Sequence, residues 1–278
     1  MSDNSRQSVQ KNLQTYHEDH MAGGQDLYFK LVAGELQLQS THKLWMEAHR
    51  DKTTRLLGVQ PHDIFVDIGC GEGYLTLPLA QRARHSFGFD LAASGMRVVQ
   101  AQTAYRPERL LLAVSEADYL PLPSASVDKL LCNHVLEHVL DDDKILAEMR
   151  RVVKPGGLVL IGVPLALGPQ TKLLLWLRRR LWPKARQLQL EKVSPGRLVP
   201  ELIGVQSHIR FYDLAALRAL LERQHFTVLQ AEGVGFSWRQ EKVRNWIRRN
   251  KLLFGLFLQL GKWFPAVGDG VLVLARRK

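Results

Sequence analysis

The segment 64–74 constrains the fold of this chain more than any other. It reads Ile-Phe-Val-Asp-Ile-Gly-Cys-Gly-Glu-Gly-Tyr. The short apolar run at its start is typical of a strand buried in a parallel sheet. Gly69, Gly71 and Gly73 follow, and apolar residues then recur at helical spacing over 75–84. The segment therefore predicts a strand, a glycine turn and a helix, with a ligand at the carboxyl end of the strand.

Two carboxylates indicate what kind of ligand this turn receives. Asp90 ends the next apolar run, about 20 residues beyond the glycines, where a carboxylate can accept both hydroxyls of a ribose. Asp67 stands directly before the first glycine. There it would repel a pyrophosphate but suit a positively charged ligand. The glycines also alternate strictly, whereas the dinucleotide fingerprint is Gly-x-Gly-x-x-Gly. These features favour a cationic nucleoside over a dinucleotide.

Six short motifs in order carry a family resemblance, at residues 66–73, 88–90, 116–121, 127–128, 133–138 and 146–157. On these the chain resembles the class I S-adenosylmethionine-dependent methyltransferases, most closely the type 11 branch that includes enzymes of ubiquinone and menaquinone biosynthesis. The resemblance covers residues 41–164. It implies an α/β fold with a doubly wound, seven-stranded Rossmann-like sheet, in which six strands are parallel and the last is antiparallel. The implied cofactor is S-adenosylmethionine.

Four regions are predicted along the chain. Residues 1–40 form an N-terminal tail or a lid over the cofactor. Residues 41–164 form the cofactor-binding core, beginning with an amphipathic helix over 41–57. Residues 165–207 interrupt the alternation of strands and helices after the fifth strand, and we expect them to form a helical cap over the substrate side. Residues 208–278 complete the core and include a basic amphipathic helical insertion at 239–264.

The resemblance also assigns cofactor contacts. Glu116, where the family usually has Asp, would accept from the adenine amino group, and the backbone N–H of Ala117 would meet the adenine ring. Asn133 would touch the methionine part. The full predicted set for the cofactor is Asp67, Gly69, Cys70, Gly71, Asp90, Leu91, Glu116, Ala117 and Asn133.

Two histidines are the candidate catalytic residues. His134 follows the fourth strand at the predicted active-site edge, and His208 lies where the chain re-enters the core. Imidazole is a suitable general base near neutral pH for an oxygen or carbon acceptor. The alternative is that both are ordinary core histidines. A metal held by His134, Glu137, His138 and His208 is a further alternative, because some similar enzymes use Glu-x-x-Glu-His for this purpose. We predict no metal.

The net charge of +11 is concentrated in two late segments. Residues 172–210 carry +7 and residues 239–278 carry +8, which leaves −4 for the remainder. This asymmetry indicates an anionic surface or substrate near the two segments. We predict methyl transfer to a small, amphiphilic or lipid-like acceptor, with peripheral membrane contact through basic helices rich in Leu and Trp. An RNA methyltransferase and a non-catalytic scaffold are the alternatives. No RNA-binding module is recognised in the sequence, and nucleic acid is the less favoured partner.

The two cysteines, Cys70 and Cys132, do not form a disulfide framework, and the polar N-terminus shows no secretory signal. The predicted location is the cytoplasm, including the inner face of the membrane. The sequence does not predict the oligomeric state.

Overall fold

The computed structural model describes residues 40–165, 194–199, 208–234, 250–268 and 270–278. The predicted N-terminal lid at 1–40 therefore lies almost entirely outside the described residues. So do most of the predicted cap at 165–207 and the part of the basic insertion before residue 250.

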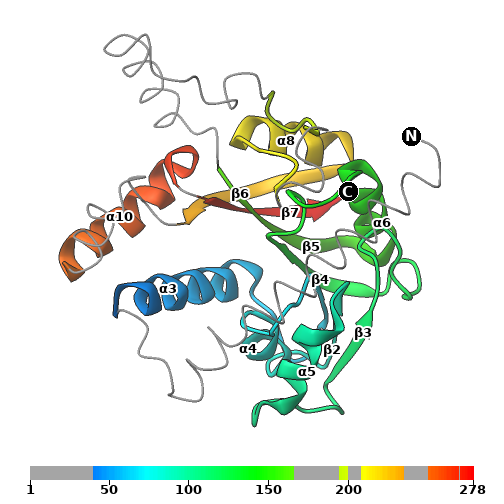
Figure 1. The fold of residues 1–278 in the computed structure, drawn as a ribbon. Coiled ribbons are helices and arrows are strands. Elements are labelled where there is room, and N and C mark those ends of the chain that lie inside the picture. Colours follow the sequence, from blue (N-terminus) through cyan, green and yellow to red (C-terminus); the bar gives the residue numbers. More distant parts are fainter. Residues whose placement is uncertain (1–39, 166–193, 200–207, 235–249, 269) are drawn as a thin grey trace, which may run out of the picture.

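The described elements form one mixed sheet with helices on both sides (Figure 1). The strands are β1 (Ile64–Ile68), β2 (His85–Asp90), β3 (Leu110–Val114), β4 (Val127–Asn133), β5 (Val153–Pro164), β6 (Phe226–Val234) and β7 (Gly270–Arg277). The helices are α3 (Ser40–Leu57), α4 (Thr76–Ala80), α5 (Ala93–Ala101), α6 (Asp142–Val152), α8 (Leu214–Arg223) and α10 (Lys251–Trp263), with a short 3₁₀ turn, η3 (Pro265–Val267).

The strand order is β3-β2-β1-β4-β5-β7-β6. Strands β1 to β5 pair in parallel, and β7 runs antiparallel to both of its neighbours, β5 and β6. Because β7 is antiparallel to both, β6 runs in the same direction as the first five strands. The prediction of six parallel strands and an antiparallel last strand is confirmed. From β1 the sheet is built outward in opposite directions, through β2 and β3 on one side and through β4 and β5 on the other. The carboxyl ends of β1 and β4 therefore border a topological switch point.

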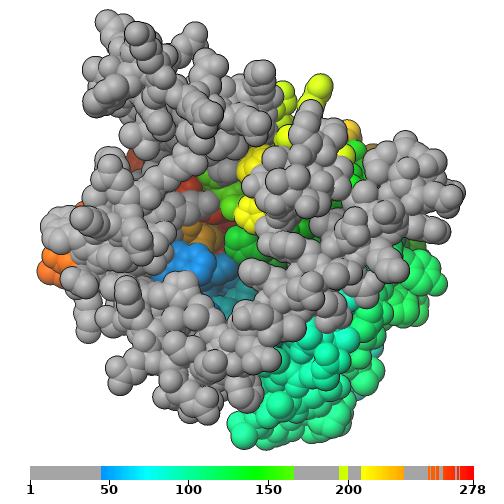
Figure 2. Space-filling model, viewed as in Figure 1, coloured from blue at the N-terminus to red at the C-terminus, as the bar shows by residue number. Residues whose placement is uncertain are grey.

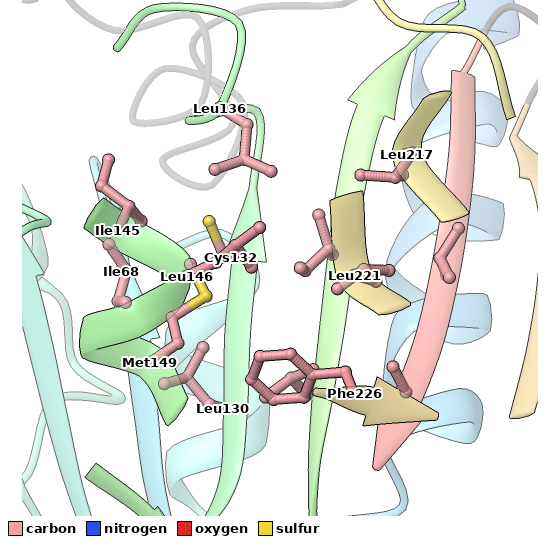
Figure 3. Packing of buried hydrophobic residues seen from close by; sticks show 14 of the residues in the cluster. Ile68, Leu130, Cys132, Leu136, Ile145, Leu146, Met149, Leu217, Leu221 and Phe226 are labelled. Atoms are coloured by element: carbon pink, nitrogen blue, oxygen red, sulfur yellow. The ribbon is translucent and has the colours of Figure 1, made fainter. Parts of the chain in front are cut away.

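The alternation of side chains along the strands divides the core into two layers. One layer packs the sheet against α6 and α8, and Figure 3 shows Met149 and Leu221 among the side chains that fill it. The other layer packs the sheet against α3 and α4, with Phe65 and Leu131 on this side. Val66 and Leu130, each one residue away from these, belong to the first layer. Burial on both faces explains why the strands read as nearly continuous apolar runs.

Two elements differ from the sequence-based expectation, and a third is described only in part. Helix α4 ends at Ala80 and not near residue 84, because the chain turns back at once and the Arg84 N–H donates to the carbonyl of Asp63 at 2.9 Å. Strand β5 begins at Val153, earlier than the predicted residue 158, and so includes the Pro-Gly-Gly turn. Helix α10 begins at Lys251, with Asn250 as an extended N-cap whose side chain accepts from Leu252 and Leu253. Residues 239–249 of the predicted insertion lie outside the described residues.

Candidate cofactor and acceptor site

The glycine turn after β1 is hydrogen-bonded to the end of β2. The backbone N–H groups of Gly69 and Cys70 both donate to the carbonyl of Phe89, at 2.7 and 3.1 Å. Gly69 has φ +74, in the left-handed region, and a Cβ there would lie 2.3 Å from Cγ2 of Val135. Only glycine satisfies both the backbone angle and the close approach. These backbone contacts hold the start of the turn against the end of β2.

Asp90 fixes the same turn from the neighbouring strand. Its Oδ2 accepts from the Gly71 N–H at 2.8 Å and its Oδ1 accepts from the Ala92 N–H at 2.9 Å. A carboxylate offers about four lone-pair positions, so two remain for the hydroxyls of a bound ribose. The Ser115 N–H donates to the Asp90 carbonyl at 3.0 Å, and this bond brings the chain after β3 to the same rim.

Asp67 is buried beneath the turn. Its side chain is only 3% exposed, and Oδ2 accepts from the Thr76 hydroxyl at 2.6 Å. Burial raises the pKa of Asp67 to about 7; the hydrogen bond from Thr76 opposes this shift and the charge of Asp90 adds to it. A positive ligand charge nearby would lower this pKa again. Thr76 was not singled out in the sequence, and only its place as the first residue of the helix after the glycines hints at this contact.

The remaining predicted cofactor residues lie at the ends of the first four strands, and the structure brings them to one rim. Cys70 is buried, and burial raises the pKa of its thiol. Leu91 and Ala117 are half-buried, and Glu116 is exposed. Oδ1 of Asn133 is buried and has no hydrogen-bond partner within the described part of the chain. This oxygen faces Gly162 of β5, where an added Cβ would lie 2.0 Å from it.

These observations test whether the residues fit S-adenosylmethionine. The backbone of the turn is only half-buried at Gly69 and Gly71, and Asp90 keeps acceptor positions for a ribose. The carboxylates of Asp67 and Asp90 stand beside the turn, which suits a ligand that carries a positive sulfonium. The residues present fit this cofactor.

The second half of the site is a cluster around Glu137, just after β4. The Glu137 side chain is 1% exposed; its Oε1 lies 2.9 Å from Nδ1 of His134 and 3.9 Å from Nε2 of His138. Its Oε2 is buried without a hydrogen-bond partner among the described residues. Burial opposes ionisation of Glu137, but the hydrogen bond and the charges of the two imidazoles bring its pKa below the ordinary value.

His134 has the geometry expected of a functional residue. Its φ is +58, which is uncommon outside glycine and is often found at active sites. Its N–H donates to the Gly162 carbonyl at 2.9 Å, and its side chain is 44% exposed. Because Nδ1 contacts Glu137, Nε2 is the ring nitrogen that does not contact this carboxylate. The backbone and the buried carboxylate together fix the orientation of the ring.

His208 reaches this cluster through backbone contacts. The N–H groups of Ile209 and Arg210 donate to the carbonyl of Glu137 at 2.9 and 3.2 Å. The rings of His208 and His138 then meet edge to face, with centroids 4.9 Å apart. Burial lowers the pKa of His208, with Glu137 opposing the shift and His134 adding to it. The structure therefore brings both predicted catalytic histidines to Glu137.

One ligand atom from each of Glu137, His138 and His208 lies within 4.8 Å of the others, a spacing that a small shift could adapt to a metal. In the described structure Glu137 already has imidazoles as partners. The prediction of no metal therefore remains a prediction.

His49 on α3 is a site residue that the sequence analysis missed. Its ring lies edge to face with His134, at 6.2 Å between centroids. Burial, followed by the charges of His134 and Lys52, lowers the pKa of His49 to about 3, while the Asn133 side chain opposes the shift. The neutral ring of His49 thus lines the site beside His134. Figure 2 shows blue atoms of α3 beside green atoms of the central strands in one recess of the surface. Nothing in the local sequence around His49 indicated this contact.

Comparison with known proteins agrees with the geometry. A model described as "Methyltransferase domain" matches residues 66–161, about a third of the chain. The chain contains a class I S-adenosylmethionine-dependent methyltransferase domain of the type 11 branch. Its cofactor is S-adenosylmethionine, which carries an activated methyl group on a positively charged sulfur.

Among the similar proteins is a ubiquinone/menaquinone biosynthesis C-methyltransferase of Acidiphilium cryptum, 30% identical over 142 residues, which are 50% of this chain and 53% of that protein. A ubiquinone biosynthesis O-methyltransferase of Paracidovorax citrulli is 35% identical over 96 residues, 34% of this chain and 40% of that protein. The chain spans about half the length of the curated relatives it matches, or less.

Solved structures extend the likeness in fold over nearly the whole of this chain. The geranyl diphosphate C-methyltransferase of Streptomyces coelicolor aligns with a TM-score of 0.59, over 97% of this chain and 98% of that one. The sequence identity is 17%, so this likeness concerns the fold alone.

Proposed function

We propose that this protein transfers a methyl group from S-adenosylmethionine to an oxygen or carbon atom of a small, amphiphilic acceptor. The observation that carries the proposal is the arrangement at the rim. The Asp90 carboxylate and the glycine turn stand at the ends of β1 and β2, and the exposed His134 stands at the end of the adjacent strand β4. A cofactor site and a candidate base thus share one edge of the sheet.

S-Adenosylmethionine, when bound, supplies a methyl group that is already activated for in-line displacement. The protein has to position the acceptor, exclude water and hold the proton that the acceptor loses. We assign the cofactor contacts to Asp67, Gly69, Cys70, Gly71, Asp90, Leu91, Glu116, Ala117 and Asn133, as the sequence predicts. Asp67 would act through its buried negative charge, because its side chain is enclosed beneath the turn.

His134 is proposed as the general base. Its Nδ1 pairs with Glu137 Oε1 at 2.9 Å, so a proton on Nδ1 would point at the carboxylate and leave the lone pair of Nε2 for the acceptor. Glu137 would then stabilise the imidazolium that forms, because it is a buried anion in direct contact with the ring. His208 is proposed to assist from the other side of Glu137, next to His138.

The amphiphilic class of acceptor is supported by the two cationic segments at 172–210 and 239–278 and by the quinone-related names of several relatives. Such an acceptor would partition into a membrane surface, so the proposal includes peripheral contact at the inner face of the membrane. No described helix is both long and apolar enough to cross a bilayer. The RNA alternative gains no support from the relatives named above.

The test is a transfer assay with methyl-labelled cofactor, offered a cellular lipid extract and an RNA extract in parallel. We expect label in the lipid extract, and no label when Asp90→Ala replaces the wild type. Glu108→Ala, which removes an exposed carboxylate elsewhere in the same half of the sheet, is the matched control and should label normally. Label in RNA alone would show that the acceptor is RNA and not an amphiphilic molecule. The absence of label from both extracts, together with no cofactor binding, would reject the proposed function.

A further inference from the structure

Helix α10 carries an exposed apolar stripe along one face. Leu252 is 86% exposed, Leu256 is 52% exposed and Trp263 is 67% exposed. Their spacing of four and seven residues places them on the same side of the helix, with the exposed Gln259 between them. Phe264, at the end of the helix, adds a fourth exposed apolar side chain, 56% exposed. Large apolar groups gathered in this way usually mark an interaction site.

The end of α10 next to this stripe is anchored to the sheet by close backbone contact. α10 packs against β6, and a Cβ added at Gly261 would lie 2.8 Å from the carbonyl oxygen of Gly233 in β6. The helix therefore has a fixed attachment near Gly261. Figure 1 shows the rest of α10 extending away from the sheet toward its N-terminus. The stripe is thus held on a rigid element and is not part of the core.

The sequence that leads into α10 and forms it is mostly cationic. Helix α10 contains Lys251 and Lys262 and no acidic residue. Over residues 239–262 the chain has seven basic side chains and one acidic side chain, Glu241. An apolar face bearing Leu and Trp, with cations beside it, is the composition of a helix that lies in the interface of an anionic bilayer. With 13 residues, α10 is far shorter than the roughly 20 residues needed to span the hydrocarbon core.

The stripe is also connected to the proposed acceptor site. The Lys52 Nζ on α3 donates to the Gly233 carbonyl at 2.8 Å, at the same place where Gly261 meets β6. Burial lowers the pKa of Lys52, Glu232 opposes the shift, and the nearby charges of Arg55 and Lys262 add to it. His49, one turn before Lys52 on α3, faces His134. A surface bound by α10 would therefore lie beside the wall of the acceptor site.

We propose that the stripe formed by Leu252, Leu256, Trp263 and Phe264 is a docking surface for an anionic lipid bilayer, from which an amphiphilic acceptor enters the site beside α3. The acceptor part of this inference rests on the proposed function; the docking part does not. Apolar insertion would supply attachment, and the cations would select negatively charged headgroups.

The test is flotation of the full chain with vesicles of phosphatidylglycerol and phosphatidylcholine, and with vesicles of phosphatidylcholine alone. We expect binding to the anionic vesicles that weakens as salt rises. The combined variant Leu252→Ser, Leu256→Ser and Trp263→Ser should lose at least about tenfold of the vesicle affinity. Leu111→Ser, Val114→Ser and Tyr119→Ser, which remove three comparably exposed apolar side chains at a distant strand and loop, form the matched control and should float normally.

Two further measurements keep the outcomes distinct. Calorimetric binding of S-adenosylmethionine without vesicles should be equal in the wild type and the stripe variant, which shows that the variant is folded. Failure of both proteins to bind the cofactor would reject the proposed function and leave the docking result standing. Equal flotation of the two proteins would overturn the docking surface. So would a wild-type dimer that the stripe variant converts to a monomer, because the stripe would then serve a second copy of the chain.

Discussion

The two halves of the site differ in how far apart in the chain their contacts are made. At the glycine turn, Asp67 meets Thr76 nine residues later, and Gly71 meets Asp90 nineteen residues later. At the Glu137 cluster, the chain that brings His208 bonds to Glu137 across some seventy residues, and His49 comes from a helix before β1. The contacts of the glycine turn therefore join residues that are close in the sequence, whereas those of the Glu137 cluster join residues that are far apart in the sequence. This difference explains why the cofactor can be read from the sequence and the acceptor cannot.

The largest expected effect is at the glycine turn. Asp90→Ala removes one hydrogen bond to the turn at Gly71, one to Ala92, and the proposed contacts to the ribose. Hydrogen bonds to a charged group contribute about 1.5–3 kcal/mol each, so cofactor affinity should fall by roughly 100-fold or more. Titration calorimetry measures this, with Glu108→Ala as the control. An affinity within a few-fold of the wild type would show that the turn does not depend on Asp90.

The next effect tests the Glu137 cluster. His134→Gln should lower kcat by about 100-fold or more with little change in cofactor affinity, because a positioned base contributes roughly 10²–10⁴-fold. Glu137→Gln should cause a smaller loss and alter the pH profile of kcat, since it removes the buried anion that pairs with His134. His62→Gln, at a histidine whose side chain is 81% exposed, is the control. An unchanged kcat in His134→Gln would show that His134 is not the general base and has a structural role.

A third prediction separates backbone strain from contact at the turn. Gly69→Ala puts a Cβ 2.3 Å from Val135 at φ +74, whereas Gly156→Ala meets nothing within 4 Å at φ +78. Left-handed strain costs about 1–2 kcal/mol in both variants. Gly69→Ala should therefore be the less stable of the two by about 1–3 kcal/mol in chemical denaturation, through overpacking alone. Equal losses would mean that Val135 moves aside freely.

A fourth prediction concerns the proton on Asp67. Its pKa in the folded protein is about 7, raised above the ordinary value of 3.8. This group contributes stability that is fully present below about pH 4 and is lost as pH rises toward 7, because only the unfolded state is then ionised. A bound sulfonium would favour the anion. Calorimetry near pH 7 in buffers of different ionisation enthalpy should thus detect release of a fraction of a proton on binding. Asp67→Asn should abolish that release, and an unaltered release in this variant would point to another group.

The smallest expected effect is that of chelation. Treatment with EDTA, followed by removal of the chelator, should leave transfer activity unchanged, because the carboxylate at the centre of the cluster is already paired with His134. Loss of activity that Zn²⁺ or Mn²⁺ restores in the wild type, but not in His208→Ala, would instead make Glu137, His138 and His208 a metal site.

The sequence predicted most of the strands to within a few residues. Ile64–Ile68 and Leu110–Val114 read as continuous apolar runs because both faces of the sheet are covered, and the observed strands have these bounds. Asp141 is a residue type that commonly caps helices, and its side chain accepts from the Lys144 N–H at the start of α6. The lengths of α4 and α10 were less predictable. The first is cut short by the bond between Arg84 and Asp63, and the second is set by the cap at Asn250.

The sequence by itself indicated the cofactor class, because strand burial, glycine geometry and a carboxylate some twenty residues later are all local properties that leave a pattern. The sheet with one antiparallel strand was implied by the resemblance that the ordered motifs carry. Only the tertiary structure decided that His49 stands against His134, that Glu137 is buried between imidazoles, and that the apolar residues of α10 face outward. The reason is physical. Contacts between distant segments depend on how the helices pack on the sheet, and no spacing along the chain records that packing.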